Sequence, residues 1–135
     1  MKYLLDTCIC IYWLRGKYHV AEMIDKVGLV HCFISEITIA ELKYGDAYAK
    51  IKGGEKYKDQ HLDRFLDNIR IIPLSIAFDR YAKEKARLRL AGTPVQDFDL
   101  LIGVTAVEER MTLVTENISD FQNIEGIKLQ NWIKR

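Results

Sequence analysis

The sequence predicts an α/β fold in which helices cover both faces of a central, mainly parallel sheet. Short apolar segments alternate along the chain with longer segments of helical periodicity, as in proteins built from β–α units. The short segments are mostly apolar rather than strictly alternating, which is typical of strands buried on both faces. The length of 135 residues and the apolar content of 49% suit one hydrophobic core. We therefore expect a single domain spanning residues 1–135.

The first part of the chain supplies the first two strands. Residues 2–5 form an apolar run that ends at Asp6, as a buried strand would. Residues 9–14 are apolar and aromatic and residues 20–27 are amphipathic, so both segments are expected to be helices. Residues 30–34 contain two β-branched residues and a phenylalanine, and they predict the second strand.

The middle of the chain predicts two helices and a third strand. Thr38 is expected to begin a helix, and the pair Gly53-Gly54 is expected to break it. Apolar residues at helical spacing predict that the helix resumes through residues 62–69. Residues 70–74 resemble a strand, which would follow that helix directly.

The last part of the chain continues the alternation. Residues 77–91 form a charged amphipathic segment that Gly92 should end. Residues 98–109 predict a helix that is buried nearly all round, and residues 112–115 predict the fourth strand. Residues 127–130 are expected to form a short fifth strand. In sheets of this kind ligands bind beyond the carboxyl ends of the strands, so these ends are where chemistry is expected.

Composition limits the cellular compartment and the kinds of partner to be expected. No apolar run is long enough to span a bilayer and no export signal is evident, so we expect a cytoplasmic protein without membrane association. The three cysteines, Cys8, Cys10 and Cys32, suggest no disulfide framework, and their spacing completes no zinc site. The net charge of +1 does not by itself predict a polyanionic partner.

Acidic residues occur where the predicted strands end. Asp6 ends the first strand, Glu41 follows the second, Asp99 begins the buried helix before the fourth strand, and Asp120 comes after that strand. Four carboxylates gathered at one edge of the sheet would repel one another and raise each other's pKa values. A divalent cation removes this repulsion, and oxygen ligands suit Mg²⁺ or Mn²⁺ rather than zinc.

Each acid also has a purely structural interpretation. Asp6 could be a turn residue at a strand end, and Asp120 could cap a short turn. Glu41 stands three residues after a threonine, which is the spacing of a helix capping box. Asp97 or Asp99 could be the N-cap of the buried helix, but one cap needs only one residue and leaves the other acid free.

The order of these segments resembles a known family. Together with Asp6 after an N-terminal strand, the segments ITIAELKYG (37–45), FDLLIGVTA (98–106) and LVTENISDF (113–121) resemble the signatures of the PIN-domain ribonucleases. More narrowly, they resemble the VapC toxins of bacterial toxin–antitoxin pairs. The resemblance covers the whole chain in the right order, and the ending IEGIKLQNW (124–132) is similar to the family's last strand and tail.

The resemblance implies a three-layer α/β/α PIN-like domain with a metal-dependent active site. Asp6 and Asp99 match the principal Mg²⁺ ligands, for which Mn²⁺ could substitute. Glu41 matches the second acid of the family pattern and Asp120 the more variable fourth. Asn117 matches a position near the fourth acid that is often polar or acidic in the family.

Asp97 has no counterpart in the family pattern, so we expect it to be the N-cap of the buried helix. Thr7, Ser35 and Thr115 stand near the same strand ends and could hydrogen-bond ligands or phosphate.

The implied activity is the hydrolysis of RNA phosphodiester bonds by a Mg²⁺-dependent endoribonuclease. The resemblance also implies a structured RNA substrate, often transfer RNA, a homodimer, and a cognate VapB-like antitoxin that blocks the site. A group of lysines near the glycine pair could follow an RNA backbone, but acids are interleaved with them and also fit a solvated face. These lysines are Lys43, Lys50, Lys52, Lys56 and Lys58.

Two other enzyme classes fit the residues less well. A receiver-like phosphorylation domain would carry an acidic pair after the first strand and a lysine after a late strand, but Thr7 follows Asp6 and Glu116 follows Thr115. A phosphatase of the haloacid dehalogenase type would carry a second aspartate where Cys8 stands. A non-catalytic module that keeps the fold and its acidic pocket is the remaining alternative.

Overall fold

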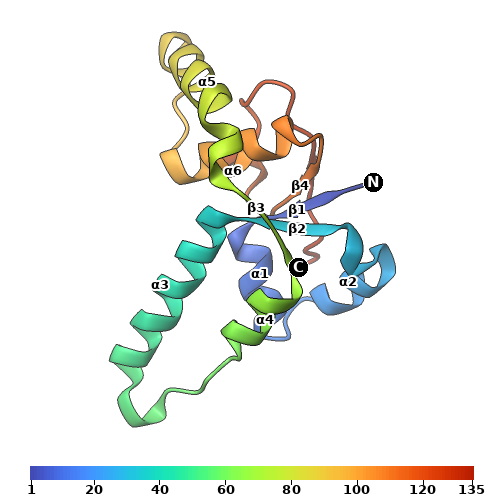
Figure 1. Ribbon diagram of the computed structural model, residues 1–135, viewed down its shortest axis with the longest axis vertical. Helices are drawn as coiled ribbons and strands as arrows, with labels where there is room; N and C mark the ends of the chain where they lie inside the picture. The colour runs from blue at the N-terminus through green and yellow to red at the C-terminus, as the bar shows by residue number, and fades with distance from the viewer.

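Five short strands form the central sheet, and every neighbouring pair is parallel. The computed structural model describes all residues from Met1 to Arg135 (Figure 1). The sheet order is β3-β2-β1-β4-β5, which confirms the predicted α/β fold with helices on both faces. The strands are β1 (Tyr3–Leu5), β2 (Cys32–Ser35), β3 (Arg70–Ile72), β4 (Thr112–Val114) and β5 (Leu129–Gln130).

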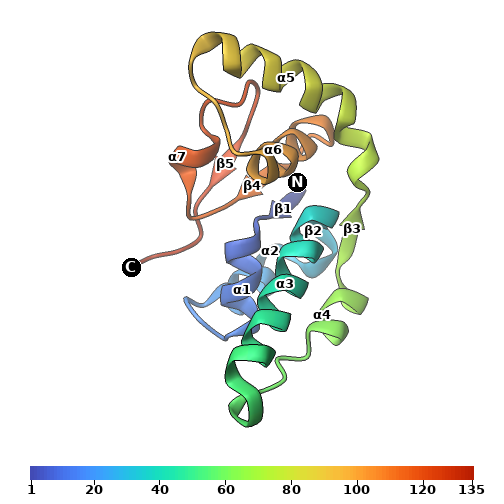
Figure 2. The ribbon, with the colours of Figure 1, turned by 90° about the vertical axis from the view of Figure 1, so that its left-hand side faces the viewer.

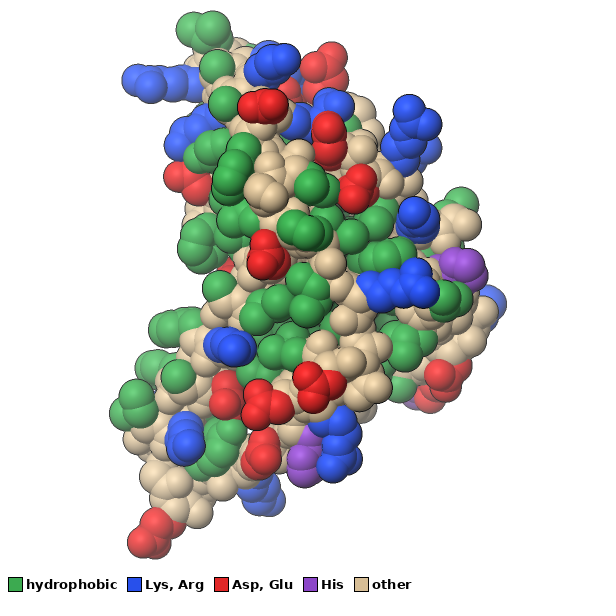
Figure 3. Space-filling model, viewed as in Figure 1, with side chains coloured by type: hydrophobic (Ala, Val, Ile, Leu, Met, Phe, Trp, Pro, Cys, Tyr) green, Lys and Arg blue, Asp and Glu red, His purple; other side chains and the backbone are tan.

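Two groups of helices enclose the sheet. Figure 2 shows α5 and α6 on one side of it and α1, α3 and α4 on the other. The outline of the molecule is indented between these two parts on the left-hand side of Figure 3. No helix is both long enough and apolar enough to cross a membrane. The helices are α1 (Thr7–Leu14), α2 (Val20–Val27), α3 (Glu36–Gly53), α4 (Leu62–Asn68), α5 (Phe78–Ala91), α6 (Asp97–Glu108) and α7 (Ile118–Phe121).

The strands are apolar because both of their faces are buried. Leu4 and Leu113 are fully buried in a cluster that includes residues of α5 and α6. Their neighbours Leu5 and Val114 point to the opposite face and are fully buried in a cluster formed with α1, α2 and α4. Successive side chains of a strand alternate between faces, so each short strand contributes to both cores.

The strand order reverses between β1 and β4. From β1 the chain builds outward through β2 to β3, then crosses to the other side of β1 to form β4 and β5. The connections that leave β1 and β4 therefore diverge, and a crevice is expected beyond the carboxyl ends of these two strands. Asp6 and Thr115 are the first residues after them, which places both at this point of the sheet.

The start of α3 differs from the prediction. The helix begins at Glu36 rather than at Thr38, and the N-cap is Ser35, whose hydroxyl accepts a hydrogen bond from the amide of Ile37 at 3.0 Å. Thr38 is fully buried inside the first turn. Glu41 therefore lies too far along the helix to complete a capping box, and the structural interpretation of Glu41 is wrong.

The start of α6 also differs. Asp97 was expected to be the N-cap, but it is already helical, and Gln96 in an extended conformation is the cap. The side-chain oxygen of Gln96 accepts from the amide of Asp99 at 3.2 Å. Asp97 instead accepts hydrogen bonds from Lys85 Nζ and the Tyr81 hydroxyl, each at 2.8 Å. Its carboxylate is thus directed toward α5 rather than toward its own helix end.

The second and third strands are shorter than predicted. Val30 and His31 belong to a 3-10 turn, η1 (Leu29–His31), so β2 begins only at Cys32. Strand β3 ends at Ile72 because the next residue is Pro73, which has no N–H to continue a ladder. A second 3-10 turn, η3 (Leu74–Ala77), then leads into α5.

Two glycines provide a matched test of the backbone. Gly92 ends α5 with φ +75°, a conformation that costs side-chain-bearing residues energy, whereas Gly45 lies inside α3 with open space where a Cβ would be. We expect Gly92→Ala to lower the free energy of unfolding by about 1 kcal/mol and Gly45→Ala to raise it by about 0.5–1 kcal/mol. Urea denaturation of the two variants measures both. Equal effects of the two substitutions would contradict the assigned backbone conformations.

Candidate active site

The four acids predicted from the sequence come from four different elements. Asp6 follows β1 directly and is the N-cap of α1, Glu41 lies on α3, Asp99 lies in the first turn of α6, and Asp120 lies in α7. Burial and, after it, the negative charges of Asp6, Asp120 and Glu41 together raise the pKa of Asp99 to about 6. Folding therefore brings all four carboxylates close enough to act on one another.

Asp6 is the most enclosed of the four, with 5% of its surface exposed. One carboxylate oxygen accepts from the Thr7 amide at 2.8 Å. The other accepts from the Thr115 hydroxyl at 2.7 Å and from the Cys8 thiol at 3.6 Å. Burial raises the pKa of Asp6, and these three donors oppose the rise. The carboxylate is held in one orientation by neutral groups that leave its charge intact.

Thr115 is itself fixed in place. Its hydroxyl oxygen accepts from the Asn117 amide at 3.0 Å while its proton goes to Asp6. The amide of Asp6 also donates to the carbonyl of Val114 at 2.9 Å, which extends the β1–β4 pairing by one residue. The ends of the two central strands are thus joined through both backbone and side chain.

Glu41 is held toward the site by two threonines. The hydroxyl of Thr7 lies 2.7 Å from a carboxylate oxygen of Glu41 and 3.1 Å from the hydroxyl of Thr38. Thr7 has one proton and gives it to Glu41, so Thr38 must donate to Thr7. This chain of hydrogen bonds joins the first turn of α1 to α3 and leaves the second oxygen of Glu41 free.

Asp99 and Asp120 have no protein group donating to their carboxylates. No lysine or arginine lies within ion-pair distance of any of the four acids. The site therefore concentrates negative charge without a protein cation to balance it. Such a cluster is costly to fold unless a cation from solution offsets the repulsion.

The donor set suits a hard divalent ion that keeps much of its water. No three His, Cys, Asp or Glu side chains are gathered closely enough to enclose an ion on their own. Mg²⁺ commonly binds through only one or two carboxylates, with water and substrate phosphate completing the octahedron. Asp6 and Asp99, the two acids whose pKa values are raised, would hold such an ion, with Glu41 and Asp120 acting through its water shell.

Comparison with known proteins identifies the family of the chain. The family model described as "PIN domain" matches residues 3–127. The chain belongs to the PIN-domain family. It is 37% identical over 139 residues to "Ribonuclease VapC2" of Rickettsia felis, covering 99% of this chain and 100% of that protein. It is 28% identical over 134 residues to "tRNA(fMet)-specific endonuclease VapC" of Salmonella typhimurium, covering 98% of both. The resemblance predicted from the sequence is confirmed.

Solved structures show the same likeness. VapBC2 from Rickettsia felis, crystallised with a DNA fragment from its promoter, matches with a TM-score of 0.83 and 32% identity over 98% of this chain and 99% of that one. DNA-bound VapBC from Salmonella typhimurium matches with a TM-score of 0.81 and 27% identity over 98% of both chains. The three-layer PIN-like fold is therefore confirmed, and the chain is a ribonuclease of the VapC type.

Within this PIN domain, three other polar residues near the strand ends do not join the four acids. Asp97 is tied to Lys85, whose charge lowers the pKa of Asp97. Ser35 is used as the cap of α3. Asn117 precedes α7, and it makes hydrogen bonds there through its backbone amide and carbonyl but not through its side chain.

Glu116 lies in the same sequence segment as Asp120, and the sequence alone gave no indication of its role. It follows Thr115 directly, but Arg135 binds its two carboxylate oxygens at 2.6 and 3.0 Å, and the Tyr12 hydroxyl donates to it at 2.6 Å. These partners, Arg135 first, lower the pKa of Glu116 to about 2. No local pattern in the sequence predicts the pairing of Glu116 with Arg135, because the two residues are far apart along the chain.

A groove begins at Glu41 and runs between α1, α3 and the segment before α4. Its volume is about 350 Å³, and its apolar wall includes Ile11, Leu14, Leu42 and Leu62. Asp46 adds a second acid to the lining beside Glu41. The lining also includes Arg15, Lys56 and Lys58. The groove therefore combines an apolar wall with acidic side chains near the active site and basic side chains at other positions.

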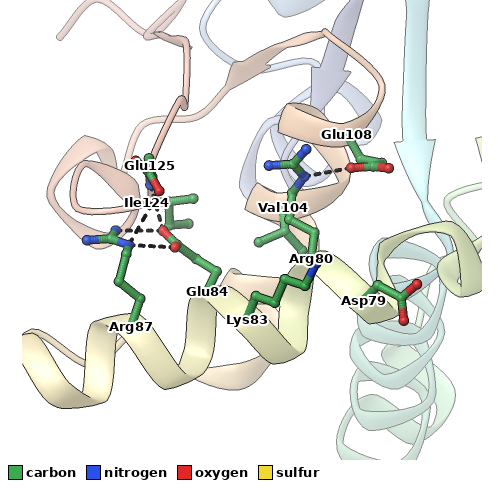
Figure 4. Close-up of a pocket in the computed structure, with 9 residues that line it drawn as sticks. All are labelled: Asp79, Arg80, Lys83, Glu84, Arg87, Val104, Glu108, Ile124 and Glu125. Carbon is green, nitrogen blue, oxygen red and sulfur yellow. Dashed lines mark hydrogen bonds and ion pairs between the residues drawn. The ribbon is translucent and has the colours of Figure 1, made fainter.

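A cavity of about 370 Å³ on the other side of the sheet has a different character (Figure 4). Its buried acid and two of its arginines are engaged in ion pairs: Arg87 binds the buried Glu84 through two nitrogens at 2.7 Å, and Arg80 pairs with Glu108 at 2.6 Å. The Glu125 amide also donates to Glu84, at 2.6 Å. This network fastens α5 to α6 and to the turn after α7, and we assign it a structural role.

The raised pKa of Asp99 predicts how the ion-free protein responds to pH. Its pKa is about 6 when folded against 3.8 ordinarily, so its contribution to stability is present below about pH 4 and is lost as the pH rises through about 6. Asp99→Asn should therefore stabilise the chelator-treated protein at pH 8 by about 1 kcal/mol, allowing for solvent screening. The gain should vanish near pH 4. Urea denaturation across this pH range measures it.

Asp97→Asn is the matched control, two residues away on the same helix. Its pKa is lowered by Lys85, so its contribution is present at neutral pH and is lost as the pH falls. This variant should be less stable than the parent at pH 8, the opposite of Asp99→Asn. Added Mg²⁺ should stabilise the parent more than Asp99→Asn. If Asp99→Asn destabilises the ion-free protein at pH 8, Asp99 does not stand in a repulsive cluster.

Proposed function

We propose that the chain is a Mg²⁺-dependent endoribonuclease toxin whose active site is formed by Asp6, Glu41, Asp99 and Asp120. The observation that supports this proposal is that the charges of Asp6, Asp120 and Glu41 all act on Asp99, near the point where the sheet order reverses, and that no protein cation pairs with any of the four. PIN-domain nucleases generally depend on a divalent metal, and oxygen-only ligands favour Mg²⁺, with Mn²⁺ as a substitute.

The ion, when bound, polarises a phosphoryl oxygen of the RNA and increases the acidity of a bound water. Asp6 and Asp99 would hold it, because both carboxylates are partly or fully buried and they lie at the end of β1 and in the first turn of α6. Glu41 keeps one oxygen on Thr7 and uses the other to orient the attacking water and accept its proton. Asp120 adds the negative charge that favours cation binding. No histidine or serine nucleophile is required.

Structured RNA is the proposed substrate, and transfer RNA is the first class to test. The relative from Salmonella typhimurium is named a tRNA(fMet)-specific endonuclease, and it aligns over 98% of this chain. Neither the net charge of +1 nor the histidines point to a particular RNA. Substrate choice therefore depends on the surfaces around the acids rather than on the acids themselves.

A VapB-like antitoxin is the proposed partner, and the groove beside Glu41 is where it would bind. The matching structures are VapBC complexes, which contain a second protein. An amphipathic segment could place apolar side chains against Leu14 and Leu42 and a basic side chain against Glu41 and Asp46. Such a segment would also cover the active site, since Glu41 belongs to both.

We also propose that the chain forms a homodimer. Large apolar side chains are exposed along one continuous stretch of chain from β3 into α5, namely Ile71, Ile76 and Phe78. Exposed apolar groups that lie close together mark a surface for protein contact. This stretch lies on elements that do not carry the four acids.

The first functional prediction concerns the ion and its two main ligands. RNA cleavage should require Mg²⁺ or Mn²⁺ and stop in excess chelator, because the carboxylates alone supply no electrophile for the phosphate. Asp6→Asn and Asp99→Asn should each abolish cleavage while the circular dichroism spectrum stays that of the parent. A gel assay with purified RNA measures both effects. Robust cleavage in excess chelator would contradict the metal mechanism. No cleavage under any condition would instead favour a non-catalytic module.

The second functional prediction concerns Glu41. Glu41→Gln keeps the hydrogen bond to Thr7 but loses the charge and the proton acceptor, so cleavage should fall by at least about two orders of magnitude with an unchanged melting temperature. Ser35→Ala is the control on the same helix. It should cost about 1 kcal/mol of stability through the lost cap while cleavage per folded molecule is retained. Parental cleavage by Glu41→Gln would reduce the site to the three aspartates.

A further inference from the structure

The outer face of α3 carries two tyrosines that the fold does not use. Tyr44 is 70% exposed and Tyr48 is 54% exposed. Their ring centroids are 6.2 Å apart with the planes inclined by 35°, and Lys52 Nζ lies 5.8 Å from the centre of the Tyr48 ring. The three residues are spaced by four, so they form one row along the helix.

These tyrosines differ from the others in the chain. Tyr12, Tyr57 and Tyr81 each donate a hydroxyl hydrogen bond to a carboxylate. Tyr3 packs against Trp132, and Tyr18 packs against Tyr12 and Arg135. Tyr44 and Tyr48 have no hydrogen-bond partner and no aromatic contact except each other. Two neighbouring aromatic rings exposed to solvent indicate a surface that binds a partner.

The row begins next to the proposed active site. Tyr44 is one helical turn after Glu41, so at 1.5 Å per residue the rings stand roughly 5 and 10 Å further along the helix axis. Figure 2 shows α3 running from beside α1, near the sheet, to the far end of the molecule. A strand bound along α3 would therefore lead directly to Glu41.

The charge along this half of α3 suits a polyanion. Lys43, Lys50 and Lys52 are exposed, and no acid follows Asp46 in the helix. The carboxylate of Asp46 is engaged by the Tyr57 hydroxyl and faces the groove, so it does not offset these lysines on the outer surface. Figure 3 shows hydrophobic side chains together with basic ones over its lower left-hand part, where α3 lies in Figure 1.

We propose that Tyr44 and Tyr48 are a stacking platform for unpaired bases of the RNA substrate, with Lys52, which lies in the same row, holding an adjoining phosphate. This inference rests on the proposed ribonuclease function and adds that the site selects a single-stranded segment. Aromatic rings can stack only on bases whose faces are free, as in loops and ends, because helical RNA hides those faces. The row would thus place an unpaired segment beside Glu41 without reading its sequence.

A second copy of the chain fits this face less well. In a two-fold interface the same patch meets itself, so Lys52 of one copy would approach the same lysine of the other. The apolar stretch of Ile71, Ile76 and Phe78 carries no such penalty and serves self-association better. RNA is therefore the occupant that the charge favours.

The test measures base stacking in the absence of cleavage. The full-length protein in excess chelator is titrated into a short single-stranded RNA that carries 2-aminopurine, whose fluorescence is quenched when the base stacks. Tyr44→Leu and Tyr48→Leu keep apolar bulk without an aromatic face, and each should weaken Kd by about 5- to 150-fold and reduce the quenching. Tyr44→Phe and Tyr48→Phe should match the parent. Leu90→Ala, at a side chain 89% exposed on α5, is the surface control and should change nothing.

Three outcomes would overturn the proposal: leucine variants that bind and quench like the parent, equal losses on fully double-stranded RNA, or a shift in oligomeric state as the main effect in sedimentation. Cleavage of RNA with Mg²⁺ is measured separately on the same variants. Parental cleavage by the double leucine variant at low substrate concentration would refute the platform while leaving the ribonuclease intact. Stacking without any cleavage by the parent would instead support the platform and refute the proposed function.

Discussion

The hydrogen bond from the Thr115 hydroxyl to the Asp6 carboxylate, at 2.7 Å, joins the two strands between which the sheet order reverses. The bond spans 109 residues of sequence, and the crossover through α5 and α6 is what makes it possible. Asp99 and Asp120 lie on the elements that come immediately before and after β4, so their placement depends on the same junction. The geometry of the acidic site is therefore a consequence of how β1 and β4 are paired.

Several acids outside the proposed site are paired with a lysine or arginine, whereas the acids of the proposed site are not. Asp97, Glu108, Glu116 and the buried Glu84 are each paired with a lysine or arginine. Asp6 and Glu41 are held only by hydroxyl, thiol and amide groups. A neutral donor fixes orientation without cancelling charge, so these carboxylates keep their attraction for a cation. In the ion-free state the repulsion between these carboxylates lowers the stability of the protein. The paired acids elsewhere do not add to this repulsion.

Helix α3 connects the parts of the proposed function. Its first turn is fixed by Ser35 and by the buried Thr38, its middle supplies Glu41, and its apolar inner side forms a wall of the groove. Its outer side carries Tyr44 and Tyr48. One helix thus touches the acidic site, the surface proposed for an antitoxin and the surface proposed for RNA. An antitoxin that displaced or covered it would affect both metal and substrate, which offers a physical basis for inhibition through a single groove.

The sequence by itself determined the fold class, the order of the elements and the four candidate acids. These follow from short apolar runs, helical periodicity, the position of each acid relative to a predicted strand or helix end, and the ordered motifs that resemble the PIN domain. Only the tertiary structure decided the roles of the neighbouring polar residues. Ser35 rather than Thr38 caps α3, Gln96 rather than Asp97 caps α6, and Glu116 is withdrawn by Arg135. The physical reason is that a cap is set by the backbone conformation of one residue, and a hydrogen bond such as Thr7 to Glu41 joins elements 34 residues apart, neither of which a local pattern records.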